Sequence, residues 1–132
     1  MILAPFTYSD RVFFRELEAM LARGRGRAAC AVEKDGDYGT ARVLMTLREG
    51  TVVYLEIRKF LVRKRFWRNC HGWVFTAEFQ EGFRAGERWH FVSDDIGRAF
   101  NQIVSGMNDG VLFEKLAIAD EGAVEAALLR LA

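Results

Sequence analysis

A run of basic and aromatic side chains is the part of this sequence best suited to binding chemistry. Six of the eleven residues from 58 to 68 are Lys or Arg, and none is acidic. Phosphate groups attract cations, and unstacked bases pack on flat aromatic faces. The run therefore predicts a strand or hairpin arm that binds RNA or single-stranded DNA. Its candidate binding residues are Arg58, Lys59, Arg63, Lys64, Arg65, Phe66, Trp67 and Arg68.

Two other interpretations of the same run remain open. Lys and Arg on an exposed edge strand prevent sheets from pairing edge to edge, and this role requires no ligand. A basic arm can also dock on an acidic protein surface, which would make the chain an accessory or adaptor subunit of a larger assembly. We take polyanion binding as the first hypothesis and protein docking through the same arm as the alternative.

The remaining polar residues form no recognisable catalytic or metal-binding pattern. Carboxylates at Asp94 and Asp95 are explained by their place at the start of an expected helix, where the helix dipole favours negative charge. Four possible metal ligands lack the C-x2-C or H-x3-H spacing of common zinc sites: Cys30, Cys70, His71 and His90. We therefore predict a binding protein rather than an enzyme, with no metal and no cofactor.

The elements that must position the arm follow from hydrophobic periodicity. Apolar residues recur at helical spacing over 10–23, with Ser9 or Thr7 as the N-cap. Alternating patterns then predict five strands, and Ser93 is expected to cap a further helix. A last helix begins at Asp120, whereas residues 111–118 fit either a strand or a helix. The predicted strands are 28–34, 40–48, one that begins at Thr51, 73–80 and 88–92.

This order of elements predicts the α+β class. We expect an N-terminal helix, an antiparallel sheet of about five strands, and C-terminal helices packed on one face of the sheet. The chain has 132 residues, the usual size of one domain, and it contains no linker-like segment. The sequence therefore predicts a single α+β domain over residues 1–132.

Composition, charge and cysteine content indicate what kind of protein this is and in which compartment we expect it. The chain is 51% hydrophobic, which excludes disorder, and 19 basic against 18 acidic residues leave a net charge of +1. Residues 1–68 nevertheless hold 14 basic and 8 acidic side chains, an asymmetry that permits a homo-oligomer. No long apolar stretch predicts a membrane span. Two cysteines forty residues apart do not indicate a disulfide framework, so we expect the cytoplasm or another reducing compartment.

Overall fold

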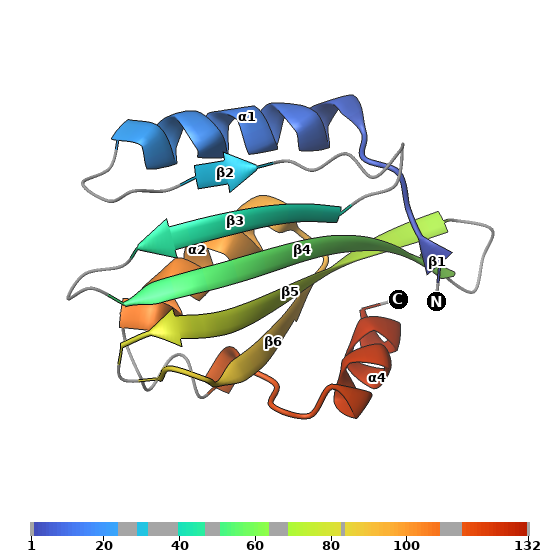
Figure 1. The fold of residues 1–132 in the computed structure, drawn as a ribbon. Helices are drawn as coiled ribbons and strands as arrows, with labels where there is room; N and C mark the ends of the chain where they lie inside the picture. The colour runs from blue at the N-terminus through green and yellow to red at the C-terminus, as the bar shows by residue number, and fades with distance from the viewer. Residues whose placement is uncertain are drawn as a thin grey trace.

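An antiparallel meander of five strands forms the centre of the molecule (Figure 1). The computed structural model describes residues 2–23, 29–31, 40–46, 51–63, 69–82, 84–108 and 115–131. The strand order is β2-β3-β4-β5-β6, and a short β1 pairs with β4. The strands are β1 Ile2–Leu3, β2 Ala29–Ala31, β3 Thr40–Thr46, β4 Val52–Arg63, β5 Asn69–Glu81 and β6 Arg88–Ser93.

Helices precede and follow this sheet, which confirms the predicted α+β class. They are α1 Tyr8–Arg23, α2 Ile96–Asn108 and α4 Gly122–Arg130. β4 and β5 are the longest strands, and β5 begins at Asn69, earlier than the alternation predicted. The paired ends of β4 and β5 are Arg63 and Asn69, with residues 64–68 between them in the sequence.

The main core lies between one face of the sheet and the helices α1 and α2. Alternation along β4 directs Val53, Leu55 and Ile57 to this face, where all three are fully buried. Phe13 contacts the ring of Phe100 at 6.2 Å between centroids, and so joins α1 to α2. Each fully buried apolar side chain of this size stabilises the fold by about 1.5–3 kcal/mol.

A second, smaller core lies on the opposite face, under α4. Val124 and Leu128 of that helix pack with Val62 and Val74 of the sheet. The C-terminal helices were expected to share one face, but α2 packs on the α1 side and α4 on the other. At this end of β4 and β5, successive apolar side chains point to opposite faces of the sheet. Apolar residues on both faces must therefore be buried.

The start of α1 is a reciprocal capping arrangement. The Thr7 amide donates to Oδ2 of Asp10 at 2.8 Å, and the Asp10 amide donates to Oγ1 of Thr7 at 3.2 Å. Of the two N-cap candidates, Thr7 is the correct one, because Ser9 lies inside the helix. The Asp10 carboxylate thereby acquires a fixed direction at the beginning of α1.

Two other local predictions are resolved differently. Asp95, rather than Ser93, caps α2, because Oδ1 of Asp95 accepts the Arg98 amide at 2.9 Å. Ser93 instead accepts the Asp95 amide at 3.1 Å. Within residues 111–118, Ile118 forms an antiparallel bridge with His90 through backbone hydrogen bonds of 2.8 and 2.7 Å, and residues 115–116 are helical. Residues 111–114 lie outside the described part of the chain.

Candidate functional site

The end of the β4–β5 hairpin extends beyond β3 on one side and beyond β6 on the other. In the described residues, pairing with β3 ends at Arg58, and pairing with β6 ends at Trp73. β4 and β5 continue to pair with each other as far as Arg63 and Asn69. We call residues 59–63 and 69–72 the hairpin end. The basic run of the sequence begins at its base.

The structure describes only part of the predicted binding set. Arg58 and Lys59 have described side chains, and Arg63 is described as the last residue of β4. The other five predicted residues lie outside the described ranges: Lys64, Arg65, Phe66, Trp67 and Arg68. The described residues therefore show only the base of the predicted binding site.

Arg58 lies on the face of the sheet that α4 covers in part. Its Nε atom is 3.2 Å from Oε1 of Glu56, and its guanidinium lies 5.3 Å from the ring centroid of Phe60. The Arg58 side chain keeps 28% of its surface exposed. A ligand at this position would therefore meet a cation that is already paired but still accessible to solvent.

Lys59 differs from the expectation that it would contact phosphate. Only 3% of the residue is exposed, and Nζ donates to Oδ2 of Asp10 at 2.6 Å. The ammonium also lies 5.3 Å from the ring centroid of Trp73. The reason is strand alternation, because position 59 has the same phase as the buried residue Ile57. That phase is visible in the sequence and is the signal that could have identified Lys59 as a core residue.

The N-terminal segment packs on the hairpin end from one side. Ile2 of β1 pairs with Leu61 of β4, and the Ala4 amide donates to the Lys59 carbonyl at 2.9 Å. The ring of Phe6 stacks on Trp73 with 5.9 Å between centroids. We call the group Thr7, Asp10, Lys59 and Trp73 the Asp10–Lys59 junction.

The C-terminal helix packs on the hairpin end from another side. A Cβ atom added at Gly72 would come within 2.6 Å of Cδ2 of Leu128, so glycine allows α4 to approach β5 closely. Figure 1 shows both chain ends near this part of the sheet. The base of the predicted arm is thus held between β1 and α4.

His71 stands beside the Asp10–Lys59 junction but remains exposed. Burial and the positive charge of Lys59 lower the pKa of His71, and the negative charge of Asp10 opposes this shift. His71 therefore carries less positive charge near pH 7 than a histidine with an unshifted pKa.

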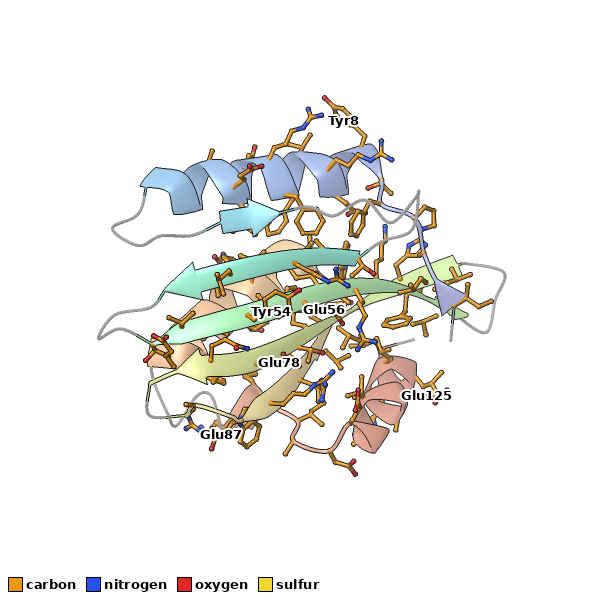
Figure 2. The ribbon with its side chains drawn as sticks, viewed as in Figure 1. Tyr8, Tyr54, Glu56, Glu78, Glu87 and Glu125 are labelled. Atoms are coloured by element: carbon orange, nitrogen blue, oxygen red, sulfur yellow. The ribbon has the colours of Figure 1, made fainter. Side chains whose placement is uncertain are left out.

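The part of the sheet that no described helix covers carries a network of ion pairs that sequence reasoning did not identify as a surface. Figure 2 shows Tyr54, Glu56 and Glu78 together on this part of the sheet. Glu56 lies 3.9 Å from Arg42, in addition to its contact with Arg58. Such alternation of opposite charges compensates the cations locally, so this surface, away from the accessible Arg58, suits a polyanion poorly.

A second set of ion pairs continues the network toward α4. Arg88 lies 3.4 Å from a carboxylate oxygen of Glu78 and 3.7 Å from one of Glu121. Below it, His90 is 1% exposed, with Nδ1 2.9 Å from Oγ1 of Thr76. Burial is the largest cause of the lowered pKa of His90. This imidazole is a core residue rather than a ligand-binding group.

These observations define an α+β protein with a meander sheet, a long central hairpin and two helices on one face. Comparison with protein-family models, curated proteins and solved structures found no match for the chain. Among the described residues, no group of three or more His, Cys, Asp or Glu could hold a metal ion. No helix in the described part of the chain has the length and apolar character needed to cross a membrane.

Proposed function

We propose that this chain is a non-catalytic binding module that contacts RNA or single-stranded DNA through the hairpin end and residues 64–68. The supporting observation is that the basic run of the sequence begins at the part of β4 and β5 that extends beyond β3 and β6. In this proposal, phosphates are neutralised by Arg58, Arg63, Lys64, Arg65 and Arg68, and bases stack on Phe66 and Trp67.

The charge distribution supports this assignment. Outside residues 58–68, the chain holds 13 basic and 18 acidic residues, so positive charge is concentrated in one segment. A local concentration of cations attracts a polyanion and accelerates its association. Most of the cations are Arg, whose planar guanidinium can hydrogen-bond phosphate with two N–H groups and stack on a base.

The test is the salt dependence of binding to a labelled single strand. We would measure fluorescence anisotropy with oligo(U) and oligo(dT) of about 15 nucleotides, near the upper site size of a single-strand-binding fold. Each phosphate neutralised contributes about −0.7 to the slope of log K against log salt. The variant R63A/K64A/R65A should therefore bind more weakly, with a slope shallower by about 2. The two oligonucleotides distinguish RNA from DNA.

A matched control removes the same charge elsewhere. The variant R84A/R88A/K115A lacks three cations outside the hairpin end, and Arg88 pairs with Glu78, nine residues along β5 from Asn69. This control should retain both the affinity and the slope of the wild type. Salt-insensitive binding, an equal loss in the control, or no binding at low salt would overturn the proposal.

Protein docking through the same arm is the second candidate, and exposed apolar side chains favour it. Ile2 is 65% exposed and lies opposite Leu61 of the hairpin end, and Leu129 of α4 is 55% exposed. The centre of a protein interface is more apolar than the rest of the surface, and Arg is enriched in interfaces. If this candidate is correct, native purification yields a defined protein complex with low absorbance at 260 nm. The variant R63A/K64A/R65A should then lose that partner.

A further inference from the structure

We infer that Lys59 is a positioning residue of the binding site, and that it acts through Asp10 rather than by contact with phosphate. This inference rests on the proposed function, because it assigns a role within the same site. It concerns a lysine that belongs to the basic run by sequence but to the core by structure. The predicted number of phosphate-contacting cations in the run falls from six to five.

The burial of the ion pair is the first argument. Lys59 is 3% exposed and Asp10 is 9% exposed, and their charged atoms are 2.6 Å apart. A buried ammonium is stable only when a partner compensates the loss of hydration. At 3% exposure, Lys59 presents almost no surface to a phosphate in solution. The lysine charge is therefore committed to a contact within the chain.

The position of the pair along the hairpin is the second argument. Lys59 lies four residues before Arg63, about 13 Å along an extended strand. Lys59 is also the register partner of Trp73 on β5, and its ammonium lies over the Trp73 ring. The ion pair between Lys59 and Asp10 therefore adjoins both strands of the hairpin at its base.

The fixed position of Asp10 is the third argument. Its carboxylate oxygen Oδ2 also accepts the Thr7 amide, so the same atom caps α1 and holds Lys59. The Lys59 carbonyl accepts the Ala4 amide, and Phe6 stacks on Trp73. The junction therefore joins the first turn of α1 to the hairpin at the point where pairing with β3 and β6 has ended. We infer that it sets the direction of the hairpin end relative to α1.

The closing experiment compares K59M, D10N and the double variant D10N/K59M with the wild type. The double variant leaves no buried charge without a partner, so it keeps the test valid where a single variant folds poorly. Affinity for oligo(U) and its salt slope are measured under conditions where circular dichroism shows each variant to be folded. The control D94N/R98M removes an exposed ion pair at the start of α2 by equivalent substitutions, an amide for the carboxylate and methionine for the cation.

For a positioning residue, K59M and D10N should each weaken binding about tenfold, comparable to the loss of one stacked base. Their salt slopes should equal that of the wild type. A direct phosphate contact would instead flatten the slope by about 0.7 in K59M, while D10N would retain the wild-type affinity. Unchanged affinity in every folded variant would show a purely structural pair. Either of these last two results would overturn the inference.

Hydrogen exchange in the free protein separates this inference from the proposed function. Loss of the junction should accelerate amide exchange at Leu61, Val62 and Gly72 more than at Val53 and Leu55, which lie at the other end of β4 and exchange only through larger openings of the fold. If the wild type binds neither oligonucleotide, the proposed function fails, and the exchange data still test the positioning. Unchanged exchange at the hairpin end would contradict the inference whatever the binding result.

Discussion

The buried ion pair between Asp10 and Lys59 connects residues 49 positions apart in the chain. Removing two charges from water is unfavourable, and only a short, well-supported contact compensates for it. Here the carboxylate is held by the α1 cap, and the ammonium lies over the Trp73 ring. Such a pair adds little net stability. It selects one arrangement of α1 and β4, because an arrangement that left either charge buried alone would be strongly destabilised.

This argument yields a prediction about stability. Lys59→Met leaves the Asp10 carboxylate buried without a cation and should lower the free energy of unfolding by about 3–5 kcal/mol. D10N should be similarly destabilising, because it leaves the ammonium unpaired. The double variant D10N/K59M should lose clearly less than the sum of the single variants. Urea denaturation measures all three, and strictly additive losses would contradict the buried coupling.

At the scale of elements, the hairpin end is held by segments from both ends of the described chain. β1 pairs with β4 at Phe60 and Leu61, and α4 packs over Gly72 of β5. The close approach of α4 depends on the absence of a side chain at residue 72. Leu128 cannot move aside easily, because it is itself 1% exposed within the smaller core.

The substitution Gly72→Ala tests this packing. The added methyl would lie 2.6 Å from Cδ2 of Leu128 and 3.4 Å from Val62, so α4 must shift. We expect a loss of about 1–3 kcal/mol in urea denaturation, as is usual for an overpacked core. Gly97→Ala in α2 is the control, because its new methyl would meet nothing closer than 3.6 Å. That change should stabilise the protein by about 0.5–1 kcal/mol, so equal effects at both glycines would contradict the packing argument.

At the scale of the whole molecule, charges are compensated across the part of the sheet that no described helix covers, and positive charge is concentrated near the hairpin. Ion pairs join Arg42 and Arg58 to Glu56, and Arg88 to Glu78. Beneath these ion pairs lies the buried residue His90, whose backbone pairs with Ile118. A near-neutral total charge therefore coexists with one segment of strongly positive composition.

The burial of His90 makes the stability of the molecule depend on pH. Burial lowers its pKa in the folded state below the ordinary value of about 6.5, which the unfolded chain retains. The unfolded state then binds the proton more readily, so stability is greatest above about pH 6.5 and falls as the pH decreases below it.

Urea denaturation between about pH 5.5 and 8 should show this decrease in the wild type. The decrease should be reduced in His90→Asn, which keeps a polar partner for Thr76. His71→Gln is the control, because His71 is exposed and its substitution should alter the profile less. A wild-type profile that is flat over this range, or one that His90→Asn leaves unchanged, would contradict the role of burial.

The parts of the fold that local patterns encode were predictable from the residues alone. Alternation identified the strands of the meander, apolar spacing identified α1 and α2, and Thr7 was a correct candidate for the N-cap of α1. The boundaries of β4 and β5 were less predictable, because pairing with a long partner strand extends each beyond its own clear alternation.

Contacts between distant parts of the chain decided the features that no short stretch of the sequence contains. The basic run marks a candidate site by composition, and its charge predicts a surface position for Lys59, whereas the alternation of β4 places this side chain in the core. Its partner Asp10 and the position of α4 over Gly72 depend on segments far apart in the chain. Residue types and spacing determine which face of an element is apolar, whereas the identity of the group that covers that face arises only when distant elements pack together.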